Sequence, residues 1–322
     1  MPVIAGIDEA GYGPRLGPLV VAATAIRFQP ESAPASPRLW SDLSAAVQDR
    51  PNRGDDRLVI GDSKKIWRGG KGLRHVERSC LSFMLAGGTE VVDFPGLLRE
   101  TLVQDALSED GPPWDRPQTV SLPLAAEVEG VRQGAERLKT AASNLGATCA
   151  GISVNVAPPT RFNRLLDMTD NKADALFLLT AEVLAHLFRK FDGEPIIITM
   201  DKQGGRDYYG PLLARAFPDM HLAVEKESPG ESRYTLTGNG RVVRLSIARG
   251  GEDRSLAVAL ASMTAKYVRE LFMRQLNAFF SRLLPDLRPT AGYWVDAGRF
   301  LQETAEVARS LDIPDSAWVR SR

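Results

Sequence analysis

The pattern of apolar and polar positions along the chain predicts strands that alternate with helices. Short apolar runs predict strands at residues 3–8, 19–28, 58–60, 150–156, 195–200 and 221–225, and alternation predicts another at 89–94. Helical spacing of apolar residues predicts helices at 73–84, 124–145, 172–191, 208–217, 256–284 and 303–311. Two alternating runs around the glycine turn at 238–240 predict a β-hairpin over 232–248. Because strands alternate with helices, we expect an α/β fold with some antiparallel pairing.

Composition places the chain among ordinary soluble globular proteins. Of its 322 residues, 43% are hydrophobic and 25% charged, which argues against wholesale disorder. No stretch approaches the ~18 apolar residues of a membrane span, and no basic region opens an N-terminal apolar run. We therefore expect a cytoplasmic protein without a membrane segment. Two cysteines exclude a disulfide-rich secreted scaffold, and three scattered histidines argue against a zinc site built on histidine.

Acidic residues stand where strands end or helices begin. Asp8 and Glu9 end the first predicted strand, Asp201 ends the strand at 195–200, and the pair Glu252-Asp253 precedes the long helix at 256–284. Converging carboxylates repel one another unless a cation neutralises them, and two Mg²⁺ ions about 3.5–4 Å apart can activate water for phosphodiester cleavage. On spacing alone, solvated loop acids explain the same pattern. The 40 basic and 40 acidic side chains cancel, so nucleic-acid binding would need a local basic face.

Five short segments, in chain order, resemble the motifs of ribonuclease HII, the type 2 ribonuclease H family. They are Gly6-Ile7-Asp8-Glu9-Ala10-Gly11 with Gly13-Pro14 and Gly17-Pro18, then Asp62-Ser63-Lys64-Lys65, Met200-Asp201, Ala261-Ser262-Met263-Thr264-Ala265-Lys266 with Arg269-Glu270, and Gly292-Tyr293. The first and fourth segments are the most specific, whereas the third and fifth are short. Together the matched regions cover about residues 3–28, 58–85 and 170–300.

The resemblance implies a ribonuclease H-like mixed sheet flanked by helices, and a chain that acts as a monomer on nucleic acid. It implies that Asp8, Glu9, Asp201 and Glu252 are both the catalytic residues and the ligands of two Mg²⁺ or Mn²⁺ ions. Members of the family cut the RNA strand of RNA–DNA hybrids, leaving 3′-hydroxyl and 5′-phosphate ends, and many cut at single ribonucleotides in DNA. The substrate-binding positions carried over are Gly11, Tyr12, Gly13, Ser63, Lys64, Lys65, Ser262, Lys266 and Tyr293.

Two positions depart from the family pattern. The residue fourteen places before Lys266 is Glu252, where the family has an aspartate, and the neighbouring Asp253 is the alternative ligand after a slip of one residue. Tyr12 stands where the family has an arginine that binds the ribonucleotide junction. Tyr12 lacks the guanidinium fork, so it either stacks on a sugar or base or only packs on the loop.

The expected domain organisation is a catalytic domain at 1–270 and a C-terminal helical cap at 271–322. The segment at about 95–150 and the hairpin at about 232–248 are interpreted as insertions, and the first has no assigned role. The basic cluster of Lys64, Lys65, Arg68, Lys71 and Arg74 favours either phosphate contact or a solvated helix start. Two rival functions stay open: a non-catalytic nucleic-acid-binding paralogue, and a nuclease of the same fold acting on another structured nucleic acid.

Overall fold

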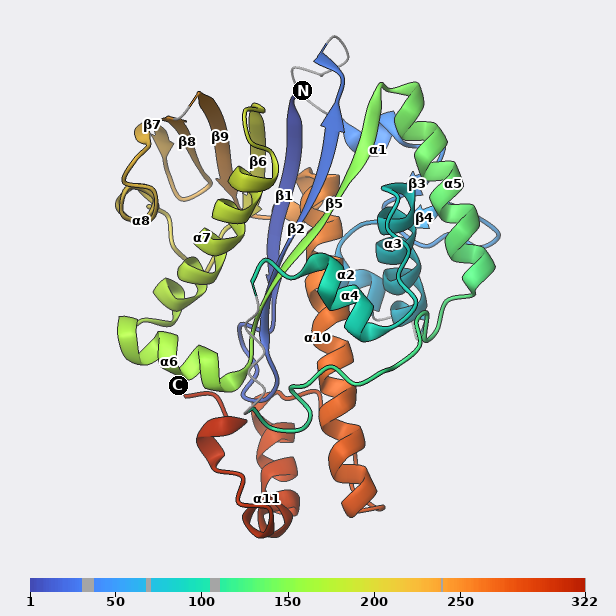
Figure 1. The fold of residues 1–322 in the computed structure, drawn as a ribbon, viewed down its shortest axis with the longest axis vertical. Helices are drawn as coiled ribbons and strands as arrows, with labels where there is room; N and C mark the ends of the chain where they lie inside the picture. Colours follow the sequence, from blue (N-terminus) through green and yellow to red (C-terminus); the bar gives the residue numbers. More distant parts are fainter. Residues whose placement is uncertain (31–37, 68–70, 105–110, 239, 322) are drawn as a thin grey trace.

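The computed structural model describes residues 1–30, 38–67, 71–104, 111–238 and 240–321, and its centre is one mixed β-sheet (Figure 1). Within the described residues, seven strands pair in the order β5-β2-β1-β6-β9-β8-β7. They are β1 (Val3–Ala10), β2 (Leu19–Phe28), β5 (Ala147–Ala157), β6 (Ile196–Asp201), β7 (His221–Glu227), β8 (Glu231–Gly238) and β9 (Arg241–Ala248). The short strands β3 (Val47–Gln48) and β4 (Leu58–Val59) form a separate pair.

Three neighbouring strands in the middle of this sheet run in the same direction. β1 pairs in parallel with β6, and β6 pairs in parallel with β9. The strands on either side, β2 and β8, pair antiparallel with this trio. The carboxyl ends of β1, β6 and β9 therefore meet at one edge of the sheet, which is where α/β proteins usually bind ligands.

Helices cover both faces of the sheet, and the alternation of side chains along β1 shows why. Ile4 faces a core shared with α3 (Gly72–Ala86), α4 (Phe94–Thr101), α5 (Val128–Asn144) and α10 (Leu256–Leu283). Val3, Ala5 and Ile7 face a second core shared with α6 (Pro159–Thr169), α7 (Lys172–Lys190) and α8 (Gly210–Ala216). Successive residues of a strand point to opposite faces, so a strand buried on both faces is apolar throughout.

Gly6 lets α10 lie directly against β1. A Cβ atom at this position would stand 2.1 Å from the backbone nitrogen of Val258 and 2.6 Å from the carbonyl oxygen of Ala257. Any side chain at residue 6 would therefore push the helix away from the strand. The close packing of α10 on β1 places the start of this helix beside Asp8.

The C-terminal part of the chain packs against the second half of α10. Here α11 (Trp294–Ser310) lies beside the end of α10, and the short 3₁₀ helix Asp315–Ala317 follows it (Figure 1). Residues of α10, α11 and the segment after the 3₁₀ helix share an aromatic cluster. The Trp318 ring stacks on Phe280 with ring centroids 5.1 Å apart, and Trp114 lies 5.6 Å from Trp318. The boundary expected at residue 270 falls inside α10, so one continuous helix joins the sheet to the cap. The division into two domains stays a prediction.

Most of the predicted elements are present, and the fold class is confirmed as a mixed α/β sheet flanked by helices. The strand predicted at 89–94 is wrong, because the side chain of Asp93 accepts a hydrogen bond from the Gly96 backbone and caps α4 instead. The last helix starts at Trp294, earlier than predicted. Both cysteines are buried and free, and no helix of the described residues is long and apolar enough to cross a membrane.

The hairpin predicted over 232–248 exists as β8 and β9, but it is not a separate insertion. β9 lies inside the main sheet, where Ile198 is opposite Leu245 and Asp201 is opposite Ala248. The correction arises because Val243, Leu245 and Ile247 are buried in the same core as β1. Sequence reasoning saw the local turn and missed the pairing of β9 with a strand forty residues away.

Candidate active site

The acidic residues predicted from the sequence stand at the carboxyl ends of the three parallel strands. Asp8 and Glu9 lie near the end of β1, and Asp201 is the last residue of β6. Glu252 follows the end of β9 by four residues, in the short helix α9 (Gly251–Arg254). A hydrogen bond of 3.1 Å from the Gly251 backbone nitrogen to Asp201 Oδ1 ties α9 to the end of β6.

Asp8 and Glu9 reach this edge from opposite faces of β1. Asp8 lies on the side of α10, where the Ser262 hydroxyl and Glu252 act on it. Glu9 lies on the side of α7, where Gln203 Nε2 lies 3.4 Å from its Oε2 and also donates to Thr180 Oγ1 at 2.8 Å. The two carboxylates are therefore held by separate sets of residues and approach each other beyond the end of the strand.

Burial, and after it repulsion between these acids, raises the pKa values of Asp8 and Glu9. Burial raises the pKa of Asp8 to about 7, repulsion from Asp201 and Glu252 adds to it, and hydrogen bonds from Ser262 and the Glu9 backbone oppose it. Burial also raises the pKa of Glu9 well above its usual range, with further repulsion from Asp8 and Asp201. Such shifts indicate negative charges that lack a full set of positive partners.

Glu252, rather than Asp253, faces the other carboxylates. Glu252 is 9% exposed, and burial raises its pKa, whereas Lys64 lowers it. Ser262 Oγ donates to Glu252 Oε2 at 3.3 Å, and Lys64 Nζ lies 3.6 Å from its Oε1. The Asp253 side chain is 65% exposed and lies 3.6 Å from Lys65 Nζ instead. The count back from Lys266 therefore leads to the residue that joins the cluster.

The second and fourth sequence motifs contact each other beside Glu252. Ser63 Oγ, at the start of α2 (Ser63–Trp67), lies 3.2 Å from Ser262 Oγ of α10. Lys266 Nζ donates to the Ser63 carbonyl at 3.4 Å and lies 4.7 Å from the centre of the Trp67 ring. Lys65 Nζ forms an ion pair with Asp62 Oδ2 at 3.0 Å. Arg68, expected in the same basic cluster, lies outside the described residues.

The donor set fits a hard divalent cation. Carboxylate oxygens are the ligands that Mg²⁺ and Mn²⁺ prefer, and a bound cation would relieve the repulsion that raises the pKa of Asp8. As the side chains stand, no group of three or more His, Cys, Asp or Glu residues in the described part of the chain is arranged to hold a metal ion. The metal ligands therefore stay a prediction.

A glycine loop follows Glu9 and carries Tyr12. Gly11 and Gly17 have φ angles of 89° and 78°, which L side chains rarely adopt, and a Cβ atom at Gly13 would meet nothing within 4 Å. Lys172 Nζ lies 4.9 Å from the centre of the Tyr12 ring, and burial and then Glu9 raise the pKa of Tyr12. Tyr12 thus packs on Lys172 beside the acids.

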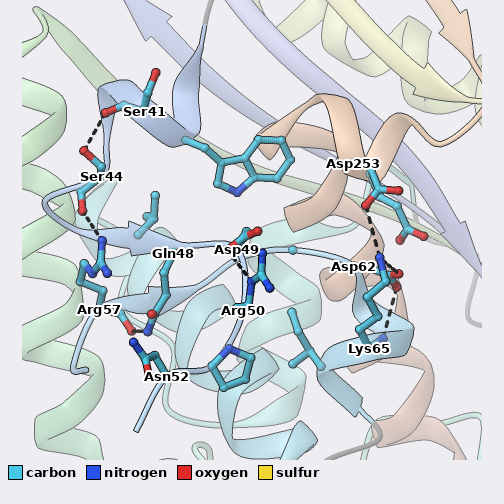
Figure 2. A pocket seen from close by; sticks show the side chains of 16 residues that line it. Ser41, Ser44, Gln48, Asp49, Arg50, Asn52, Arg57, Asp62, Lys65 and Asp253 are labelled. Carbon is cyan, nitrogen blue, oxygen red and sulfur yellow. Dashed lines mark hydrogen bonds and ion pairs between the residues drawn. The ribbon is translucent and has the colours of Figure 1, made fainter. Parts of the chain in front are cut away.

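One hollow adjoins the acidic cluster at Glu252, and a smaller one lies beside Tyr12 of the glycine loop. The larger has a volume of about 1090 Å³ and extends from Glu252 and Asp253 towards the pair β3 and β4. Figure 2 shows Asp62, Lys65 and Asp253 on one side of it, with Asn52 and Arg57 on the other. The smaller hollow has a volume of about 610 Å³, and its lining includes Tyr12, Lys172, Gly204, Arg206 and Tyr208. An extended ligand that crosses the acidic cluster would have space on both sides of it.

Tyr293 lies at the start of α11, 56% exposed, beside the glycine loop. The preceding Gly292 carbonyl accepts hydrogen bonds from the backbone nitrogens of Arg15 at 2.8 Å and Leu16 at 3.2 Å. The first and fifth motifs are therefore joined by backbone hydrogen bonds, although 276 residues of sequence separate Leu16 from Gly292.

Sequence reasoning missed three residues that hold this region together. Gln203 bridges Glu9 to α7, and its position two residues after Asp201 was the signal that could have found it. Arg269 belongs to the fourth motif, but the sequence assigned it no role. Its Nη2 donates hydrogen bonds to the carbonyls of Leu16 and Ala291 at 3.2 and 3.0 Å. Arg320, near the C-terminus, contacts the glycine loop, and nothing in its sequence context signals this.

Comparison with known proteins found similarity in solved structures. No protein-family model matches the sequence, and a search of curated proteins found no match. The chain is similar to one in the PCNA:RNase HII complex from Archaeoglobus fulgidus, with 16% identity over 99% of this chain and 94% of that chain and a TM-score of 0.42.

It is also similar to ribonuclease H2 from Pyrococcus horikoshii OT3, with 14% identity over 98% of this chain and 92% of that chain and a TM-score of 0.41. Against Bst-RNase HIII in complex with Mn²⁺, the identity is 16% and the TM-score 0.42, over 99% of this chain and 65% of that chain. Each of these structures contains a ribonuclease H of type 2 or type 3.

Proposed function

We propose that this protein is a metal-dependent endoribonuclease that cleaves the RNA strand of RNA–DNA hybrids. The observation that carries the proposal is the cluster of Asp8, Glu9, Asp201 and Glu252 at the ends of three parallel strands. Four buried or half-buried acids at one sheet edge are costly for folding, because burial and repulsion raise the pKa values of Asp8, Glu9 and Glu252. Such a cost is typical of a functional site.

The four carboxylates would hold two Mg²⁺ or Mn²⁺ ions, and the ions would supply an activated water and charge neutralisation at the leaving oxygen. Asp8 and Glu9 must lose their protons before they can act as ligands, and a pKa of about 7 for Asp8 makes this step sensitive to pH near neutrality. Ser262 holds the Glu252 carboxylate through its hydroxyl group. Cleavage in this way leaves 3′-hydroxyl and 5′-phosphate ends.

Substrate would lie over the glycine loop and the lysines of α2. Gly13 is exposed with open space beside it, so its backbone is accessible to a ribose or phosphate. The Lys64 and Lys65 side chains are 76% and 70% exposed and can approach phosphates beside the acids. Tyr293 would stack on a sugar at the other end of the loop. The cytoplasmic location and the monomeric state stay predictions.

The test is an incubation of the protein with Mg²⁺ or Mn²⁺ and three labelled duplexes: an RNA–DNA hybrid, DNA with one ribonucleotide, and plain DNA. We expect the hybrid to be cut with 3′-hydroxyl ends and plain DNA to stay intact. Asp201→Asn should abolish cleavage, whereas Asp219→Asn, an exposed acid before β7, should not.

The result also decides between the open alternatives. Tight binding of the hybrid without cleavage in either metal would favour the non-catalytic paralogue. Cleavage of plain or branched DNA in preference to the hybrid would favour a nuclease of the same fold with another substrate. Either outcome would overturn the proposed function.

A further inference from the structure

Arg320 is a buried arginine without an acidic partner. Arg320 is 4% exposed. No carboxylate forms an ion pair with it within the described residues, which are 1–30, 38–67, 71–104, 111–238 and 240–321. Burial, and then repulsion from Arg269, lower its pKa to about 9. A buried charge without a counter-charge is expensive, so the contacts that Arg320 makes must have a use that compensates the cost.

Those contacts span the glycine loop from one end to the other. Arg320 Nη1 donates to the Gly11 carbonyl at 2.5 Å, and Nε donates to the Gly17 carbonyl at 2.9 Å. The backbone nitrogen of Arg320 also donates to the Arg15 carbonyl at 3.0 Å, and Leu16 forms an antiparallel bridge with Val319. One side chain therefore fixes both left-handed glycines of the loop.

The tail that carries Arg320 is itself anchored at both sides. Asn163 of α6 donates from Nδ2 to the Val319 carbonyl at 2.9 Å and accepts from the Ser321 backbone nitrogen at 2.8 Å. Trp318 is 2% exposed and stacks on Phe280 of α10. The guanidinium thus reaches the loop from a fixed support rather than from a free chain end.

We propose that Arg320 is a positioning residue for substrate binding, which holds the Gly11 and Gly17 carbonyls of the glycine loop from the C-terminal tail. This inference rests on the proposed function, because it takes the loop between Gly11 and Gly17 to bind the sugar–phosphate backbone of the substrate. Glycines sample many backbone conformations, and the two carbonyl contacts select one of them. The loop is then ready to bind the sugar–phosphate backbone without paying for its own ordering.

The experiment uses the full chain with Arg320→Met, Arg320→Lys and the control Arg241→Met. Arg241 is a comparably buried arginine, paired with Asp192 at the start of β9, which is the far end of the strand from the acids. For each variant we would measure KM and kcat on the RNA–DNA hybrid, the thermal midpoint, and metal-free binding of the hybrid by fluorescence anisotropy.

We expect Arg320→Met to raise KM and weaken metal-free binding by about tenfold or more, with kcat changed less than about twofold. Arg320→Lys should fall between wild type and Arg320→Met, because an ammonium group keeps the charge but lacks the fork. Arg241→Met should lower the thermal midpoint without changing KM.

An unchanged KM in Arg320→Met, with a loss of thermal stability like that of Arg241→Met, would overturn the role of Arg320 and leave the proposed function intact. If Arg320→Met does not fold, the same comparison is made with Arg320→Lys, and an unchanged KM there has the same meaning. A wild-type chain that neither binds nor cuts the hybrid would overturn the proposed function, and this inference with it.

Discussion

The acidic cluster and the glycine loop follow each other in the chain, yet they bury opposite charges. Asp8 and Glu9 belong to a group of acids, and burial together with repulsion from their neighbours raises the pKa values of these two residues. The loop that begins two residues later lies on Arg269 and Arg320, which are 8% and 4% exposed. A ligand made of cations and a polyanion would complement both regions, the cations at the acids and the polyanion at the loop. A metal–nucleic acid complex is a ligand of this kind.

The two regions manage their excess charge in different ways. A carboxyl group can take up a proton, so Asp8, whose pKa burial raises to about 7, can lose its charge near neutral pH. A guanidinium group keeps its proton, so the two arginines donate hydrogen bonds to backbone carbonyls instead, as in the contact of Arg320 with Gly17. The charge of the acidic cluster therefore changes with pH, whereas the charge of the two arginines under the loop does not.

The largest expected effect comes from removing a charge from the acidic cluster. Asp8→Asn should lower the metal-dependent cleavage rate by about a thousandfold, because it removes a ligand and a charge from the reacting centre. The same substitution should raise the thermal midpoint in EDTA, because it removes repulsion with Asp201 and Glu252. Cleavage assays and thermal melts check both parts, and full activity of the variant would contradict the two-metal site.

The next comparison separates two neighbouring acids. Glu252→Gln should lower the cleavage rate by about a hundredfold or more, because Glu252 is buried among the other carboxylates. Asp253→Asn should change it by about twofold at most, since exposed ion pairs contribute little. Rates measured at saturating Mg²⁺ decide the ranking, and the reverse order would assign the fourth ligand to Asp253.

A smaller effect concerns the choice of substrate by the loop. Without an arginine at position 12, we expect hybrids with several ribonucleotides to be cut well and a lone ribonucleotide in DNA poorly. Tyr12→Arg should narrow this gap by about ten- to a hundredfold, as one charge-assisted hydrogen bond contributes about 1.5–3 kcal/mol.

The control for this substitution is Tyr208→Arg, which adds the same charge to the same hollow outside the loop. Both substrates are compared at one salt concentration, since phosphate contacts depend on salt. Equal wild-type rates on the two substrates would mean that the loop backbone recognises the junction without a side chain at residue 12.

The last effect concerns the stability of the fold as a function of pH rather than the cleavage rate. The pKa of Asp8 is about 7 in the folded protein against 3.8 as the usual value, so the folded state binds more protons between these values. The free energy of unfolding should therefore fall as pH rises from about 4 to about 7, by at most about 1.4 kcal/mol per pH unit for this group.

Urea denaturation in EDTA across this range would measure the slope. Asp8→Asn should flatten it, and saturating Mg²⁺ should restore the stability of the wild type above pH 7 because the cation replaces the proton. A slope of the opposite sign in the wild type would show that the acids are not mutually destabilising.

The sequence alone predicted the elements whose hydrophobic pattern is long or continuous. The strand at 3–8, the helix at 172–191 and the helix at 256–284 are present with nearly the predicted bounds, because each must bury an apolar face. It also predicted that Asp8 and Asp201 stand at strand ends. It failed at residues 89–94, where the cap formed by Asp93 outweighs a short alternating pattern.

Pairings between distant segments were decided only by the tertiary structure. From the sequence, β9 is only one arm of a local hairpin. In the structure Val243 and Leu245 are buried in the sheet core, and β9 is the third parallel strand, which leads to Glu252. Nothing local distinguishes Glu252 from Asp253, because neighbouring residues of a helix point in different directions and packing selects which one is buried. Arg320 meets Gly11 across 309 residues of chain, and such a contact depends on how the tail packs against α6 and α10 rather than on any pattern around either residue.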